Sequence, residues 1–259
     1  MNAYVLKWIA IIGMVTNHMA IAWWDIIPLG LAFPLYAAGG LTFPIMGYFV
    51  VEGYKHTSSL KKYILRILVV GLIAMPFHIL ALGIPLGGFP SYPILNIMFS
   101  IALSLLVLAL YDKIKIKALF WLIYVLLIVP ISLMLFEWYF IGITTVLLFY
   151  IIPNENARRI IPPIFAGLCW FAMSLLSRAT LQYMEVVPEL LADANFMTVM
   201  LTFGIGCVAA VPLLKKYNGE RGKKSKWLFY IIYPLHLAIL AIVALALGLI
   251  DLSGFGLYL

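Results

Sequence analysis

Long apolar runs that are nearly free of charge constrain this chain more than any other feature of its sequence. A run of about twenty apolar residues is the length that a helix needs to cross the hydrocarbon core of a bilayer. The runs show no alternation with a period of two residues, which argues against a membrane β-barrel. Only 10% of the residues are charged and 65% are apolar, whereas a soluble domain has about 25% charged residues. The sequence therefore predicts an integral membrane protein.

Nine of these runs are predicted to be transmembrane helices of one polytopic all-α bundle, with residues 1–259 forming a single domain. Their ranges are 4–24, 30–52, 62–82, 94–111, 118–136, 138–152, 160–178, 196–214 and 227–249. With the N-terminus in the cytoplasm, all basic residues except Arg178 fall on the cytoplasmic side, as the positive-inside rule requires. The net charge of +7 thus reflects topology, and we expect no nucleic-acid partner. We expect a multi-pass protein of a bacterial-type cell membrane.

The first predicted helix, 4–24, carries ionisable groups on one face. His18 follows Lys7 by eleven residues, which at 100° per residue brings the two side chains within about 20° of each other. They stand about 16 Å apart along the helix, so Lys7 lies at the cytoplasmic interface and His18 deep in the bilayer. An ionisable residue at that depth is a functional-site hypothesis. The alternative is a histidine that hydrogen-bonds to a neighbouring helix.

The second predicted helix is rich in residues that loosen a helix: Pro34, Gly39, Gly40, Pro44 and Gly47. Backbone groups freed in this way are tolerated in a membrane only where protein or a water-filled cavity covers them. We expect this helix to line an interior cavity, and close helix packing is the alternative.

Three cations and a tyrosine, Lys61, Lys62, Arg66 and Tyr63, precede or begin the third helix at the cytoplasmic interface. Such a cluster is typical of an orientation signal or a contact with lipid headgroups. It also suits an anionic cytosolic ligand, because ammonium and guanidinium groups bind phosphates.

Polar residues also lie towards the outer side and in the last helix. His78, Asn96 and Glu137 fall in the outer half, and together they suggest a cavity that opens outward. In the last helix His236 lies near the midplane, and Tyr233 is close to the same face. This pair can relay protons or simply satisfy its own hydrogen bonds. Cys169 and Cys207 lie inside predicted helices, and we expect neither a disulfide framework nor a metal site.

Six segments of the chain resemble a known family. The Lys7-x10-His18 spacing resembles the basic-x10-His signature in the first helix of the acyltransferase-3 type superfamily of membrane acyltransferases. The wider pattern is similar to the TraX family, which includes the enzyme that acetylates conjugative pilin. The matching segments are LKWIAIIGMVTNHMA (6–20), LTFPIMGYFVVEGYKHT (41–57), KKYILRILVVGLIAMPF (61–77), LNIMFSIAL (95–103), EWYFIG (137–142) and KWLFYIIYPLHL (226–237).

The resemblance implies acyl transfer from a cytosolic acyl-CoA, most simply acetyl-CoA, to an amine or a hydroxyl. His18 would act as general base or acyl carrier, with Asn17 beside it, and both roles need a neutral imidazole. His236 and Tyr233 would orient the acceptor or stabilise the oxyanion. The residues expected to hold the CoA are Lys7, Glu52, Lys55, His56, Lys61, Lys62, Tyr63 and Arg66. The partners implied are acyl-CoA, membrane lipids and an acceptor that is a protein N-terminus, a lipid, a sugar or a small amine.

Three positions depart from the family pattern. Asn17 stands where an aspartate is usual, so it can give the imidazole a hydrogen bond but no charge. Gly40 stands at about the place of an arginine, and His78 at the place of an aspartate. The residues alone therefore leave two other functions open. One is a proton-coupled transporter that uses His18 and His236, and the other is a catalytically inactive relative.

Overall fold

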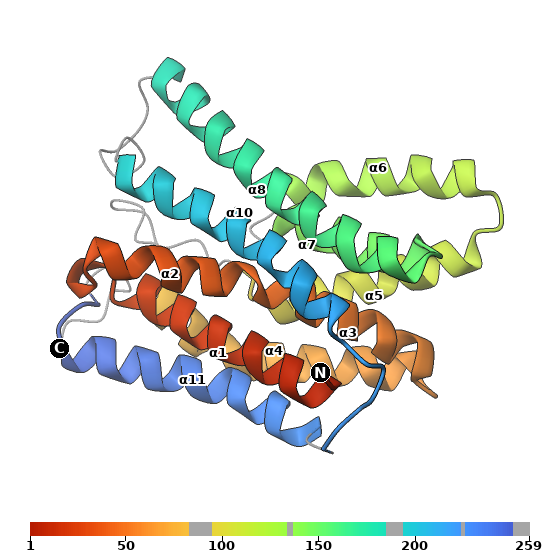
Figure 1. Ribbon diagram of the computed structural model, residues 1–259, viewed down its shortest axis with the longest axis horizontal. Coiled ribbons are helices and arrows are strands. Elements are labelled where there is room, and N and C mark those ends of the chain that lie inside the picture. The colour runs from red at the N-terminus through yellow and green to blue at the C-terminus, as the bar shows by residue number, and fades with distance from the viewer. Residues whose placement is uncertain (83–94, 134–136, 185–193, 224–225, 251–259) are drawn as a thin grey trace. The chain divides into compact units, whose positions relative to one another are not determined.

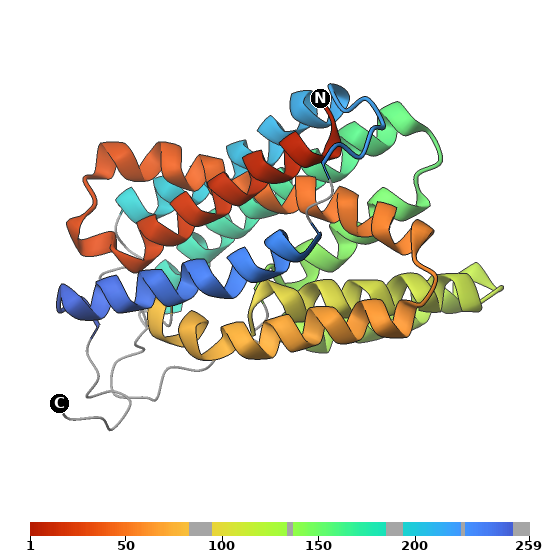
Figure 2. The same cartoon turned by 90° about the horizontal axis from the view of Figure 1, so that it is seen from below.

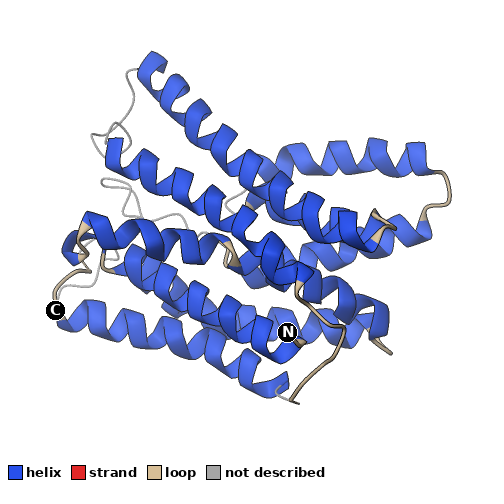
Figure 3. Ribbon diagram, viewed as in Figure 1, coloured by secondary structure: helices blue, strands red, loops and turns tan. Residues whose placement is uncertain are grey.

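The computed structural model of the chain describes residues 1–82, 95–133, 137–184, 194–223 and 226–250, and in these residues every regular element is helical (Figure 3). The predicted all-α fold is therefore confirmed. The elements are α1 (Ala3–Ala22), the 3-10 helix η1 (Trp24–Ile26), α2 (Leu29–Gly40), α3 (Thr42–His56), α4 (Leu60–Leu82), α5 (Ile97–Lys113), α6 (Lys117–Leu133), α7 (Tyr139–Ile151), α8 (Glu155–Met184), α10 (Ala194–Lys215) and α11 (Lys226–Ala246).

The second predicted helix is broken into α2 and α3 at Leu41. Pro44 has no backbone N–H, so the carbonyl of Gly40 cannot receive the usual bond from four residues on. The Thr42 hydroxyl lies at the break and donates to the carbonyl oxygen of Ala10 in α1 at 2.9 Å. The helix that proline and glycine were expected to loosen is thus interrupted, and the Thr42 side chain bonds the interruption to the neighbouring helix.

Four helical stretches are long and apolar enough to cross a membrane: Ala3–Ala22, Leu29–His56, Leu60–Leu82 and Phe229–Ala246. Apolar side chains stand exposed on the helices, for example Leu72 at 62% and Leu126 at 64%. Exposed apolar surface of this extent fits a lipid environment better than water. The helices Lys117–Ile131, Tyr139–Ile151 and Leu201–Lys215 are apolar but shorter. The number of nine spans and their orientation stay predictions.

The chain divides into two compact units. Unit 1 consists of Met1–Phe49 and Ile151–Lys224, and unit 2 consists of Val50–Tyr150 and Ser225–Leu259. Each unit therefore combines segments that are distant in the sequence, and the division falls inside α3. The single domain expected for 1–259 stays a prediction.

Unit 1 is built from α1, α2, α8, α10 and the first half of α3. α10 packs against both α8 and α2, and α1 packs against α2 (Figure 1). The backbones of α2 and α10 come very close: a Cβ atom on Gly40 would lie 1.9 Å from the carbonyl oxygen of Phe203. A Cβ on Gly206 would lie 1.9 Å from the carbonyl oxygen of Ala37. Small residues permit such an approach between membrane helices.

Unit 2 contains the second half of α3 together with α4, α5, α6, α7 and α11. α4 packs against α11 and α5, and α5 packs against α6. The hydroxyls of Tyr124 in α6 and Thr144 in α7 share a 2.7 Å hydrogen bond. Asp112 at the end of α5 accepts hydrogen bonds of 2.7 Å from the hydroxyls of Tyr54 and Tyr150. These bonds join α3, α5 and α7 at one end of the unit.

Candidate functional site

His18 and Asn17 are buried in unit 1, with 4% and 6% of their surface exposed. They lie on α1, and Asn17 touches Gly39 of α2: a Cβ atom on Gly39 would lie 2.4 Å from Asn17 Cγ. The Nδ2 atom of Asn17 is buried and has no hydrogen-bond partner among the described residues. A buried donor without a partner is costly and calls for an explanation. One explanation is an oxygen atom of a ligand placed beside His18.

Lys7 lies on the same helix as His18. α1 runs without interruption from Ala3 to Ala22, so the predicted separation of about 16 Å along one face applies. The Lys7 ammonium nitrogen lies 4.9 Å from the centre of the Phe49 ring in α3. A cation at that distance over an aromatic face is attracted by it. Three of the twelve predicted site residues, Lys7, Asn17 and His18, therefore lie in unit 1.

Cations and aromatic rings contact one another at one end of unit 1, which we call the basic–aromatic end, and Lys7 joins them through the Phe49 ring. They come from the start of α1, the middle of α3, the start of α8 and the segment after α10. The N-terminus lies beside the segment after α10 in Figure 2, where the Ala3 N–H donates to the Glu220 carbonyl at 2.8 Å. The basic–aromatic end consists of Lys7, Tyr48, Phe49, Glu155, Arg158, Arg159, Tyr217 and Arg221.

Glu155 is the shared anion of the basic–aromatic end. It accepts a 2.8 Å hydrogen bond from the Tyr48 hydroxyl and forms ion pairs with Arg158 and Arg159. Burial acts to raise the pKa of Glu155, but the Tyr48 hydrogen bond and the two guanidinium charges outweigh it and hold this pKa below its ordinary value. The carboxylate therefore stays ionised and holds the start of α8 against α3.

Tyr233 and His236 lie together on α11 in unit 2, with ring centres 5.6 Å apart. The Nδ1 atom of His236 lies 3.0 Å from the Ile232 carbonyl oxygen. The Tyr233 hydroxyl is buried within electrostatic reach of Glu137 and lies close to the backbone of Ile97. The predicted His–Tyr pair is thus present, and it adjoins a carboxylate.

The polar residues predicted towards the outer side meet at the start of α5. Glu137 Oε2 accepts a 2.8 Å hydrogen bond from the Ile97 N–H and lies 3.5 Å from His78 Nε2. Asn96 caps α5 through Met98 N–H and donates to the Gly71 carbonyl of α4 at 2.8 Å. A carboxylate at a helix N-terminus is stabilised by the orphan N–H groups there. These three polar side chains are therefore neighbours.

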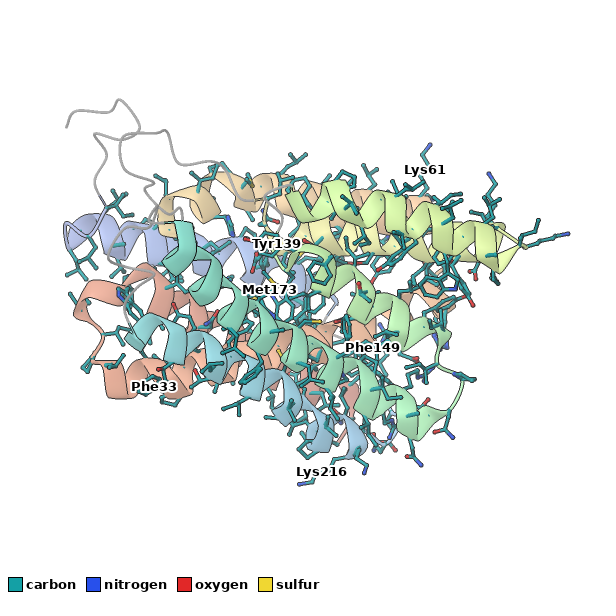
Figure 4. All side chains as sticks on the ribbon, turned by 90° about the horizontal axis from the view of Figure 1, so that it is seen from above. Phe33, Lys61, Tyr139, Phe149, Met173 and Lys216 are labelled. Atoms are coloured by element: carbon teal, nitrogen blue, oxygen red, sulfur yellow. The ribbon has the colours of Figure 1, made fainter. Side chains whose placement is uncertain are left out.

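The predicted CoA cations outside α1 belong to unit 2. Lys55 pairs with Glu52 at 3.8 Å, and His56 Nδ1 lies 2.8 Å from the Glu52 carbonyl oxygen. Lys61 and Lys62 are exposed, and Figure 4 shows Lys61 directed away from the helices.

Arg66 and Tyr63 form a second contact in this region. The guanidinium carbon of Arg66 lies 6.0 Å from the centre of the Tyr63 ring, and Arg66 Nε is buried without a hydrogen-bond partner among the described residues. The Tyr63 hydroxyl lies against Gly53 of α3, where a Cβ atom would be 2.8 Å away. This set therefore joins the end of α3 to the start of α4.

The structure thus distributes the predicted site over both units. Unit 1 holds Lys7, Asn17 and His18, and unit 2 holds Glu52, Lys55, His56, Lys61, Lys62, Tyr63, Arg66, Tyr233 and His236. Sequence reasoning did not assign the partners of Lys7 in the basic–aromatic end. The adjacent arginines Arg158 and Arg159 were visible as cations, but nothing local to them indicates that Tyr48 and Tyr217 lie beside them.

The departure at Gly40 has a structural reason. Its backbone lies against the Phe203 carbonyl of α10, so no side chain fits there without moving α2 away from α10. An arginine is therefore incompatible with the helix packing of this chain. At the second departure, His78 lies beside a carboxylate, with its Nε2 atom 3.5 Å from Glu137 Oε2.

Comparison with known families decides the membership of the chain. A family model described as "TraX protein" matches residues 2–244, which include every predicted site residue. The chain belongs to the TraX family. A curated relative of this TraX protein is the "Probable fimbrial assembly protein FimC, serogroup H1" of Dichelobacter nodosus, 28% identical over 253 residues that cover 92% of this chain and 94% of the relative. No solved structure matches the chain.

Proposed function

We propose that this TraX protein is a membrane acyltransferase that moves an acetyl or short acyl group from cytosolic acyl-CoA to an amine or hydroxyl. The observation that carries this proposal is the buried Asn17 amide, which has no hydrogen-bond partner among the described residues and precedes a buried imidazole. Acyl transfer requires a general base and a nearby hydrogen-bond donor for the carbonyl oxygen of the thioester. The similarity of the Lys7–His18 spacing to the acyltransferase-3 type signature supports the same reaction.

In the reaction, His18 takes the proton from the acceptor N–H or O–H as the acceptor atom attacks the thioester carbonyl. The Asn17 amide donates a hydrogen bond to the carbonyl oxygen as it becomes an oxyanion. The C–S bond then breaks, and the imidazolium returns its proton to the departing thiolate. The products are the acylated acceptor and CoA thiol. In a second route His18 attacks the thioester itself and carries the acyl group to the acceptor.

The donor is proposed to approach from the cytoplasmic side, where Lys7 begins the path along α1 towards His18. Tyr233 and His236 are proposed to orient the acceptor, since their rings lie together on α11 with centres 5.6 Å apart. The curated relative is described as a probable fimbrial assembly protein. This description, together with the resemblance to the pilin acetylase, favours a protein of a surface filament as acceptor over a lipid, a sugar or a small amine.

The test is release of CoA thiol and transfer of label from [14C]acetyl-CoA by the purified protein in detergent, with a membrane extract as source of acceptor. We expect transfer by wild type and by Ile12→Ala, an exposed residue on the same helix. Asn17→Ala is expected to lower kcat by about 10²-fold, the loss typical of an oxyanion donor. Wild-type protein that neither binds nor turns over acetyl-CoA would refute the proposal.

A proton-coupled transporter is the competing function. It predicts solute uptake into proteoliposomes driven by a pH gradient, with no CoA compound present. The acyltransferase predicts no such uptake and an absolute requirement for acyl-CoA. The presence or absence of acyl-CoA in the assay thus distinguishes the two functions.

A further inference from the structure

We propose that His78 and Glu137 form a pH-sensitive tether at the start of α5, which tightens when the His78 imidazole takes up a proton. His78 belongs to α4, and Glu137 lies two residues before α7. Both residues are in unit 2. This switch goes beyond the proposed acyl transfer and does not depend on it.

Glu137 holds the start of α5 with its backbone as well as its side chain. Its Oε2 atom accepts the Ile97 N–H at 2.8 Å, and its own N–H donates to the Leu95 carbonyl at 2.9 Å. The Ser100 hydroxyl donates to the Glu137 carbonyl. One residue therefore fastens the first turn of α5 to the stretch that leads into α7.

His78 brings α4 to the same carboxylate. Its Nε2 atom lies 3.5 Å from Glu137 Oε2, which is longer than an ordinary hydrogen bond. The attraction between the two side chains therefore depends on the charge of the imidazole. His78 makes no other ion pair or hydrogen bond in the described part of the chain. The Glu137 side chain is 24% exposed and the His78 side chain 6%, so protons can reach the pair through the carboxylate.

Lysine and arginine are missing from the helices at this end of unit 2. In α4 the last such residue is Arg66, in α5 the first is Lys113, and in α11 it is Lys226 alone, while α7 contains none. All three lie at the opposite ends of their helices from the His78–Glu137 pair. A protonated histidine is thus the cation that these helices can place beside Glu137.

The other titratable side chains at this end are Tyr139, Tyr233 and His236. Tyr233 and His236 lie on α11, which packs against α4. A tyrosine never becomes a cation. His236 places its Nδ1 atom 3.0 Å from the Ile232 carbonyl oxygen of its own helix. His78 is therefore the side chain whose protonation creates an ion pair with Glu137.

The direction of the switch follows from these charges. Histidine is the side chain that changes its charge between about pH 5 and 8, and a carboxyl group ordinarily titrates below that range. At the acidic end of this range an imidazolium faces a carboxylate, and the tether gains an ion pair. The gain is lost as the pH rises and the imidazole becomes neutral.

The turn that follows Glu137 is suited to respond to this change. Trp138 and Tyr139 have left-handed φ angles of 66° and 38°. Residues other than glycine keep such angles only where surrounding contacts hold them. The predicted topology places the pair towards the outer side of the membrane, so the acidity that it would sense is that outside the cytoplasm.

The experiment is hydrogen exchange of the protein in phosphatidylcholine nanodiscs at about pH 5.5 and about pH 8, with each rate corrected for the intrinsic rate at that pH. For wild type we expect the segments 97–104 and 137–142 to be about tenfold better protected at the lower pH, as a hydrogen bond to a charged group contributes. His78→Gln keeps a polar side chain without the charge and should show equal protection at both pH values. His56→Gln, an exposed histidine of the same unit, is the matched control and should keep the wild-type difference.

Glu137→Gln is the second variant, since its amide oxygen can still accept the Ile97 N–H while the ion pair is removed. It should also lose the pH difference, and it decides the question if His78→Gln does not fold. Equal protection of wild type at both pH values would overturn the proposal. So would a pH difference that persists in Glu137→Gln and His78→Gln, or one that only His236→Gln abolishes.

Discussion

Gly39 of α2 lies directly against the carboxamide of Asn17 on α1, and a Cβ atom on Gly39 would be 2.4 Å from Asn17 Cγ. The contact fixes the residue that precedes His18, although the two residues lie on different helices. The position of the candidate catalytic histidine thus depends on a residue that has no side chain of its own.

Gly39→Ala should therefore disturb both the fold and the activity. The added methyl group must displace Asn17, and overpacking of this kind costs about 1–3 kcal/mol. Gly30→Ala on the same helix is the control, because nothing lies within 4 Å of the Cβ that it would add. Thermal unfolding and acetyl transfer of both variants should show a loss for Gly39→Ala and an unchanged or raised stability for Gly30→Ala. Equal thermal stability and equal acetyl transfer in the two variants would contradict the contact between Gly39 and Asn17.

The helix break and the apolar helices could be predicted from the sequence because their causes are local. Pro44 disrupts a helix wherever that helix lies, and apolar runs form helices in lipid because the backbone must satisfy its own hydrogen bonds. The face shared by Lys7 and His18 follows from helix geometry alone.

The basic–aromatic end could not be predicted, because its contacts join segments far apart in the chain. Tyr48 and Glu155 are separated by 107 positions and meet through one hydrogen bond. The closeness of Gly40 to Phe203 is likewise a property of two backbones, and no local pattern in the sequence marks it. The meeting of His78 with Glu137 was suggested only by their common placement in the outer half.

The Gly40 contact predicts that the arginine usual in the family is not tolerated here. Gly40→Arg should prevent α2 from packing on α10, and even Gly40→Ala should lower the melting temperature, because its Cβ would lie 1.9 Å from the Phe203 carbonyl oxygen. Size-exclusion profiles and thermal unfolding in detergent test this. A Gly40→Arg protein as monodisperse and as stable as wild type would show that the helices pack differently.

The Glu137 tether predicts a stability loss in unit 2. Glu137→Ala leaves the Ile97 N–H and the neighbouring His78 without their acceptor, at a cost of about 1–3 kcal/mol. Glu137→Gln keeps an acceptor for the Ile97 N–H and should lose less. Trp138 and Tyr139 follow with left-handed φ angles of 66° and 38°, a conformation that surrounding contacts must hold in place, so loss of the tether should also loosen the backbone there. Hydrogen exchange at the start of α5 should rise most in Glu137→Ala, and equal exchange in all three proteins would exclude this role.

Glu155 predicts an acid-sensitive contribution to stability. Because the pKa of Glu155 is below its ordinary value when folded, its contribution is present above the ordinary carboxyl pKa and is lost as the pH falls through the folded value. Melting temperatures across the acid range should therefore fall more steeply for wild type than for Glu155→Gln. Glu220→Gln serves as the control, because Glu220 is exposed and accepts its hydrogen bond from the neutral Asn218 amide. Parallel curves for wild type and Glu155→Gln would contradict the assignment.

The most direct test of the central claim is the single-turnover rate of acetyl transfer from [14C]acetyl-CoA by wild type and His18→Gln. If His18 is the general base or the acyl carrier, the variant should be slower by about 10²-fold or more, with its melting temperature unchanged. A His18→Gln protein that transfers the acetyl group at the wild-type rate would contradict the account.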